Sequence, residues 1–278
     1  MQNIVERPNS GTPQPFKVVV PQKPGGFADR FDFTIEPYLG CTFGCDYCFV
    51  PGQSIVHSEA FMGAWGSWYY PTSENIREEI RHNFSTNKTS AIYLASNTDA
   101  WQPVEKKSLI TRSVLCALRE YEFSYLLCST RSPLITRDID VIKALRGDVQ
   151  VGVSIPTNLE SVRKLSEPAA PKIEDRIKTL KVLKDAGIRV RAHLAPLLPH
   201  GDDFVARIVD VCDSVWIDYP DSHTPAKEKL FIKNGWNDWL SKNLIEDLFY
   251  KYQNAFPSKV FKFGQKHFFD PLSTSAGN

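Results

Sequence analysis

Three cysteines lie close together in the segment EPYLGCTFGCDYCFVPG, which covers positions 36–52. They are Cys41, Cys45 and Cys48, in the pattern CxxxCxxC. Closely spaced thiolates bind soft metals. A structural zinc site normally takes four protein ligands. Three cysteines on a four-iron cluster instead leave one iron open, and an open iron can bind a small molecule through its amino and carboxylate groups.

The composition is that of a packed globular protein. The chain has 278 residues, of which 42% are hydrophobic and 23% charged, and its net charge is +1. This balance does not predict strong non-specific attraction to nucleic acid. The apolar runs fall far short of the roughly 20 residues that a membrane span needs. The N-terminal segment has no apolar stretch and no cleavage pattern, so we expect a cytoplasmic protein without membrane association.

The remaining cysteines, Cys116, Cys128 and Cys212, are isolated in the sequence. Six cysteines in a cytoplasmic chain of this length do not indicate a disulfide framework. We expect these three to be ordinary buried or surface thiols, although Cys128, at the end of a predicted strand, could also donate a hydrogen atom.

The elements that must position the first three cysteines alternate regularly along the chain. Strand-like segments are predicted at 31–36, 91–96, 123–130, 148–155, 188–195 and 214–219. Helical patterns follow at 72–84, 104–121, 135–147, 173–187 and 202–211. Six such units predict an α/β fold with a parallel sheet, arranged as a partial (β/α)6 TIM-type barrel. A doubly wound open sheet is the alternative.

Three regions are expected in the chain. Residues 1–30 are rich in Pro, Gly and Asn and predict an extended N-terminal segment. Residues 31–219 form the partial barrel. Residues 220–278 are expected to be a C-terminal helical extension packed on the core, with one long helix over 231–256 and a short strand within 260–269.

The cysteine motif resembles that of a known family. CxxxCxxC with an aromatic residue before the last cysteine, in the loop after the first strand of a β/α array, is similar to the motif of the radical S-adenosylmethionine (SAM) superfamily. The segments SNTDAWQPVEKK, STRSPLITRDIDVI, SEPAAPKIEDRIKTLKVLKDAGIRV and LAPLLPHGDD resemble its spore-photoproduct-lyase-like branch. This narrower resemblance covers roughly residues 33–203.

The resemblance implies an enzyme with two cofactors. Cys41, Cys45 and Cys48 would hold a 4Fe–4S cluster, and SAM would chelate the open iron. An electron from a flavodoxin- or ferredoxin-type reductant would cleave SAM to methionine and a 5′-deoxyadenosyl radical. The radical would abstract hydrogen from a substrate, while the protein orients the reactants and excludes water.

The resemblance also implies residues that contact SAM. Tyr47 would contact the adenine, while Thr98, Arg131 and Ser154 would hold the ribose and the methionine part. We expect Asp99 to orient the SAM-binding loop. Two positions depart from the true lyase. Ser96 stands where the lyase has its hydrogen-donor cysteine, and Phe49 replaces a tyrosine, so the lyase's own repair mechanism is not expected.

Strand alternation predicts which side chains face the barrel interior. Arg191, His193 and Asp218 fall on the inward side of the fifth and sixth strands. Buried polar groups are costly unless they are paired or solvated. One hypothesis is that these three residues line a substrate pocket near the cluster. The alternative is an ion pair between Arg191 and Asp218 that only closes the barrel.

The substrate does not follow from fold and cofactor. The resemblance favours a nucleobase or nucleic acid, whereas the near-neutral charge favours a nucleotide, a peptide or a small metabolite. A non-catalytic zinc or iron–sulfur module, in which the thiols and one further ligand staple the loop, is the alternative from another class.

Overall fold

The computed structural model describes residues 17–22, 30–52, 65–67, 69–72, 75–217 and 224–262. Its main feature is an eight-stranded sheet in the order β1-β2-β5-β6-β7-β8-β9-β10. These strands are β1 (Val19–Pro21), β2 (Phe33–Ile35), β5 (Ala91–Leu94), β6 (Glu122–Thr130), β7 (Arg146–Ser154), β8 (Arg189–Leu194), β9 (Ser214–Ile217) and β10 (Val260–Lys262). A separate small sheet pairs β3 (Tyr38–Leu39) with β4 (Tyr70–Pro71).

Within the eight-stranded sheet, β2 and the strands β5 to β10 all run parallel to one another, and β1 pairs antiparallel with β2. The six predicted strands are β2 and β5 to β9, and they lie side by side in chain order. A doubly wound sheet would reverse this order at a switch point. In the described part of the chain the sheet keeps two open edges, at β1 and β10. The predicted partial barrel is therefore confirmed.

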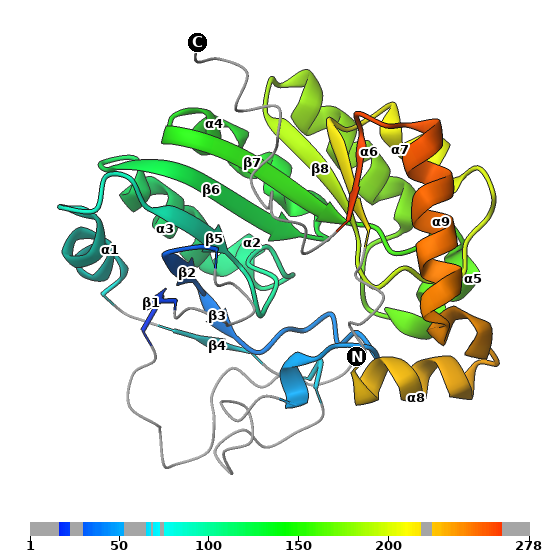
Figure 1. The fold of residues 1–278 in the computed structure, drawn as a ribbon. Coiled ribbons are helices and arrows are strands. Elements are labelled where there is room, and N and C mark those ends of the chain that lie inside the picture. The colour runs from blue at the N-terminus through cyan, green and yellow to red at the C-terminus, as the bar shows by residue number, and fades with distance from the viewer. Residues whose placement is uncertain are drawn as a thin grey trace.

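Helices connect the strands and cover one side of the sheet. Figure 1 shows α3, α4 and α6 on that side. In the described residues, the helical segments up to β9 are η1 (Val50–Gly52), α1 (Ile76–Phe84), α2 (Glu105–Ser108), α3 (Ile110–Leu118), η3 (Pro133–Asp138), α4 (Ile139–Lys143), α5 (Glu160–Ser166), α6 (Ile173–Asp185) and α7 (Phe204–Val209). In α6, Ile173, Ile177, Leu180 and Leu183 are buried in the main core, as their spacing predicts.

Two helical predictions within the barrel were wrong in detail. The helix expected over 104–121 is divided at Leu109, whose φ is 54°. The reason is that the Glu105 carboxylate accepts hydrogen bonds from the backbone N–H groups of Thr111 (2.9 Å) and Arg112 (3.2 Å), which begins a new helix there. The helix expected over 135–147 ends at Lys143, and Gly147 lies in β7, where a Cβ atom would come within 2.4 Å of the backbone and side chain of Phe123.

The C-terminal segment contains shorter helices than expected. The helix predicted over 231–256 is divided into α8 (Pro225–Lys233), the short η4 (Asn237–Leu240) and α9 (Lys242–Ala255). Gly235, with φ 70°, interrupts the first, and the Ser241 hydroxyl caps the last by accepting from the N–H of Leu244 at 3.4 Å. The strand expected near the end is β10, which extends the sheet beside β9.

Helix α9 packs on the main core through Ile245, Phe249 and Tyr252, whereas α8 buries Leu230 and Phe231 against the cysteine loop. The C-terminal helices therefore contact both the barrel and the candidate site. Among the helices of the described ranges, none has the length and apolar character that crossing a membrane requires.

Candidate functional site

The three cysteines lie on the loop that runs from β3 to η1, after the first strand of the barrel. Cys41 and Cys45 are buried and Cys48 is half-buried. The loop turns at Gly44, whose φ is 54°, and a Cβ atom there would lie 2.8 Å from Cα of Gly66. Only glycine fits both the backbone conformation and this close approach.

A buried glutamine holds the start of the cysteine loop. Oε1 of Gln102 accepts from the N–H of Thr42 at 2.9 Å, and its Nε2 donates to the carbonyl of Gly40 at 3.2 Å. Farther along the loop, the N–H of Asp46 donates to the carbonyl of Ser166 at the end of α5. The sequence did not predict this role of Gln102, because a side chain that bonds to the backbone of residues far away along the chain leaves no periodic pattern.

The donor set fits an iron–sulfur cluster. Three thiols share one loop and are surrounded by a shell that includes Phe43 and Leu198. Across the described residues, no three Cys, His, Asp or Glu side chains converge on one point as ligands of a single metal ion would. In a four-iron cubane each thiolate binds a different iron, so its ligands do not have to converge in this way.

Burial controls the protonation of these thiols. It raises the pKa of Cys41 to about 12. It also raises the pKa of Cys45 well above its ordinary value, although the positive charge of Arg131 opposes the change. The thiols are therefore protonated without metal, and binding a cluster must release their protons.

Arg131, in the loop after β6, joins the cysteine loop to a buried carboxylate. Its Nη1 donates to Sγ of Cys45 at 2.7 Å and to the hydroxyl of Tyr47 at 3.0 Å, and it forms an ion pair with Glu167. The Tyr47 hydroxyl also donates to Glu167, and Arg176 pairs with the same carboxylate at 2.6 Å. Burial would raise the pKa of Glu167, but the charges of Arg176 and Arg131 outweigh it and lower the pKa.

Asp99 connects the loops that follow β5 and β6. Its carboxylate accepts from the Thr130 hydroxyl at 2.7 Å, from the N–H of Arg131 at 2.8 Å and from the N–H of Trp101 at 2.9 Å. Burial raises the pKa of Asp99, and these hydrogen bonds oppose the rise. The carboxylate is placed to hold both loops in one arrangement, and its expected part in binding SAM stays a prediction.

The turn after β5 is held by Glu36. Its Oε1 accepts from the N–H groups of Ser96 (2.8 Å) and Asn97 (3.1 Å), and from the Ser96 hydroxyl. Thr98 donates from its hydroxyl to the carbonyl of Tyr38 at 3.0 Å. Burial raises the pKa of Glu36 to about 7. Ser96 therefore acts in the structure as a hydrogen-bond donor to Glu36.

The inward-facing residues of β8 are buried in the barrel. The Arg191 guanidinium carbon lies 5.0 Å from the centroid of the Trp216 ring. The His193 ring occupies the space beside Gly152, where a Cβ atom would lie 2.4 Å from its Cε1. Burial, together with the charge of Arg191, lowers the pKa of His193 well below its ordinary value, so the imidazole is neutral.

Two further predicted residues complete the set. Ser154 is half-buried at the end of β7, and its carbonyl accepts from Nη1 of Arg176 at 3.1 Å. Asp218 lies outside the described residues. Its predicted pairing with Arg191 and its predicted place in a pocket both stay predictions.

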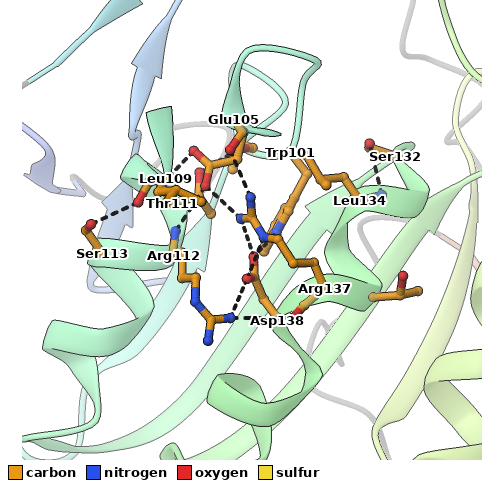
Figure 2. Close-up of polar contacts among 12 residues, drawn as sticks. Trp101, Glu105, Leu109, Thr111, Arg112, Ser113, Ser132, Leu134, Arg137 and Asp138 are labelled. Carbon is orange, nitrogen blue, oxygen red and sulfur yellow. Dashed lines mark hydrogen bonds and ion pairs between the residues drawn. The ribbon is translucent and has the colours of Figure 1, made fainter. Parts of the chain in front are cut away.

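A second polar network lies around the α2–α3 junction. Figure 2 shows Asp138 accepting from Trp101 and from the guanidinium groups of Arg112 and Arg137, while Arg137 also reaches Glu105. Glu105 in turn accepts from the hydroxyl of Tyr38 in β3. This network ties the loop after β5 to the start of the cysteine loop.

A family model for the radical SAM superfamily matches residues 35–211. The chain belongs to this superfamily. It is therefore an enzyme whose cofactors are a 4Fe–4S cluster and SAM. The alternative of a non-catalytic metal module is left without support.

The relatives share part of their length with this chain. An uncharacterized protein of Methanocaldococcus jannaschii is 33% identical over 168 residues, which is 60% of this chain and 61% of the relative. An uncharacterized protein of Mycobacterium tuberculosis is 24% identical over 184 residues, 65% of this chain and 54% of the relative. The matched region is thus less than two thirds of either relative.

Solved structures of spore photoproduct lyase have a similar fold. The lyase complexed with dinucleoside spore photoproduct aligns with a TM-score of 0.62 at 13% identity, covering 86% of this chain and 78% of the lyase chain. A mutant lyase with bound AdoMet and the same dinucleoside aligns with a TM-score of 0.60. At this identity the similarity shows the fold alone.

Proposed function

We propose that the chain binds its cluster through Cys41, Cys45 and Cys48 and abstracts hydrogen from an organic substrate held inside the partial barrel. The observation that carries this proposal is the common position of the candidate residues. The cysteine loop, the Ser96–Asp99 turn, Arg131 and Ser154 all lie at or after the C-terminal ends of parallel strands. These ends share one edge of the sheet, which is where barrel enzymes place their reactive groups.

When bound, the cluster and SAM supply a 5′-deoxyadenosyl radical. The chain's part is to hold and shield the reactants. The described side-chain hydrogen bonds of Arg131 all use Nη1. We assign Nε and Nη2 to the SAM carboxylate, a group that a guanidinium binds well. The Tyr47 ring, whose hydroxyl is fixed by Glu167, is assigned to the adenine. Thr98 and Ser154 are assigned to the rest of SAM, and Asp99 keeps their loops in place.

Arg191, His193 and Asp218 are assigned to the substrate. Arg191 offers charged N–H donors, and neutral His193 offers one donor and one acceptor. The spore photoproduct lyase structures contain a dinucleoside, so a nucleobase is the first substrate class to test. Peptides and small metabolites come next. Ser96 argues against the lyase's own hydrogen-donor chemistry, and a flavodoxin- or ferredoxin-type protein is the proposed reductant.

Anaerobic reconstitution tests the cluster assignment. The wild-type chain should take up about four irons and four sulfides, and it should form 5′-deoxyadenosine from SAM when dithionite is added. Cys45→Ala should lose iron, whereas Cys116→Ala, the matched control on α3, should keep it. A wild-type chain that binds zinc tightly but takes up no iron and sulfide would refute the proposal.

The substrate assignment needs a separate measurement. Arg191→Met should leave iron uptake and substrate-independent SAM cleavage unchanged, since the residue is not assigned to either cofactor. It should abolish the stimulation of SAM cleavage by an active nucleobase compound. If Arg191→Met keeps the full stimulation of SAM cleavage and changes only the stability of the fold, Arg191 only closes the barrel.

A further inference from the structure

We propose that Glu167 is a positioning residue that aims the Arg131 guanidinium at Cys45 and thereby raises the reduction potential of the cluster. The proposal rests on the proposed cluster site. It concerns three side chains, Arg131, Glu167 and Arg176, that connect the cysteine loop to the body of the barrel. None of them is a cluster ligand.

Glu167 is the centre of this group. It lies between α5 and α6, and its side chain is fully buried. Its Oε1 accepts hydrogen bonds from the Tyr47 hydroxyl and from Nη1 of Arg131. Its Oε2 forms an ion pair with Nη2 of Arg176 at 2.6 Å. A buried carboxylate is stable only when it is paired and hydrogen-bonded. Two guanidinium groups satisfy this requirement, so the direction of each depends on the carboxylate between them.

Arg176 fixes that carboxylate to the scaffold. It is fully buried on α6. Its Nε donates to the carbonyl of Pro171 at 3.0 Å, and its Nη1 donates to the carbonyl of Ser154 at 3.1 Å. The guanidinium therefore binds the α5–α6 loop through Nε and the end of β7 through Nη1, and its Nη2 forms the ion pair with Glu167. It has little freedom to turn, and neither has the carboxylate that it holds.

Arg131 completes the connection to the cysteines. Its backbone N–H is fixed by Asp99, and its side chain reaches Glu167 and Sγ of Cys45 through the same nitrogen, Nη1. An ion pair that served stability alone would not need an N–H group on a sulfur atom. The contact at 2.7 Å instead brings a positively charged donor to a cluster ligand.

The electrostatic consequence has a definite sign. Reduction adds one negative charge to the cluster, and hydrogen bonds and charge near the sulfurs control the potential of iron–sulfur centres. A positive donor on Cys45 favours the reduced form. A change that turns the Arg131 guanidinium away from Cys45 would therefore lower the reduction potential of the cluster. Losing the negative charge of Glu167, with Arg131 still in place, would raise it.

The test is a redox titration of the cluster-loaded chain, followed by electron paramagnetic resonance of the reduced cluster. Arg131→Met should lower the ratio of reduced to oxidised cluster at a fixed potential by about tenfold, which is about 59 mV for one electron. Arg137→Met is the matched control, because Arg137 makes comparable ion pairs with Glu105 and Asp138 instead. It should leave the ratio unchanged.

Glu167→Gln separates positioning from simple charge. If Glu167 acts through Arg131, the ratio should fall, and the same substitution should have no such effect in an Arg131→Met background. A rise that persists in that background would show that Glu167 acts only by its own charge, and it would overturn the proposal. An unchanged potential in Arg131→Met or in Glu167→Gln would also overturn it.

If Arg131→Met does not take up iron, Arg131→Lys replaces it. The lysine keeps the charge but lacks the planar fork, so a smaller fall in the ratio is expected. Failure of both Arg131 variants to load would count against the proposal, because Arg131 would then be needed to build the site. Failure of the wild-type chain to load would instead refute the cluster assignment itself.

Discussion

Replacing Asp138 by Asn tests the network at the α2–α3 junction. The carboxylate is fully buried and accepts from Trp101 Nε1 at 2.9 Å, from Arg112 Nη1 at 2.8 Å and from Arg137 Nε and Nη2 at 2.9 and 2.8 Å (Figure 2). Asparagine has nearly the same size, but it has no charge. One of its two terminal groups donates hydrogen bonds instead of accepting them, so it cannot serve all four N–H groups.

The expected cost follows from these contacts. A hydrogen bond to a charged group contributes about 1.5–3 kcal/mol, and breaking a buried ion pair costs about 3–5 kcal/mol. The Arg112 and Arg137 side chains keep exposures of 29% and 25%, so water partly replaces the lost carboxylate. We expect Asp138→Asn to lower the free energy of unfolding by about 2–3 kcal/mol.

Urea denaturation followed by circular dichroism measures this loss. Asp140→Asn is the matched control, because Asp140 pairs with the same Arg112 but its side chain is 64% exposed. Exposed pairs contribute at most about 1 kcal/mol. A loss in Asp138→Asn no larger than that in Asp140→Asn would refute the reasoning.

The same variant has a pH signature. Burial would raise the pKa of Asp138, but hydrogen bonds from Arg137, Arg112 and Trp101 outweigh it and lower the pKa. The stabilisation is therefore complete above the ordinary carboxyl pKa of about 3.9 and is lost as the pH falls through the folded value. The stability difference between wild type and Asp138→Asn should shrink below about pH 4. A constant difference would contradict the assignment.

Three other predictions concern single sites. Gly152→Val should lower the free energy of unfolding by about 1–3 kcal/mol, because its Cβ would lie 2.4 Å from Cε1 of His193; an unchanged thermal midpoint would argue against this contact. Burial raises the pKa of Glu36 to about 7, so wild type loses stability as the pH rises towards 7, and Glu36→Gln should gain relative to it between about pH 5 and pH 8. If urea titrations give the same difference in the free energy of unfolding between wild type and Glu36→Gln at about pH 5 and pH 8, the titration of Glu36 does not affect stability. Ser241→Ala should cost about 1 kcal/mol in thermal denaturation by removing the cap on Leu244, and no loss would show that the cap is not needed.

Much of the fold could be predicted from local pattern. Strand-like patterns, some of them alternating apolar and polar residues, located all six barrel strands, and the spacing in 173–187 located α6 and its buried face. These signals are reliable because each depends on neighbours within one element. The division of the predicted helices at Leu109 and Gly235 was missed, because helical periodicity continues across each break. At Leu109 a carboxylate within the same segment caps the new helix.

The candidate site also combines features that the local sequence predicts with features that only the tertiary structure shows. The sequence by itself determined the cysteine motif, its place after the first strand and the superfamily, since these depend on spacing along one segment. Only the tertiary structure decided that Gln102 holds the cysteine loop, that Arg131 points at Cys45 and that Glu167 joins Arg131 to Arg176. The physical reason is distance along the chain. Buried polar groups must be paired, but their partners lie far away in sequence, and only folding brings them together.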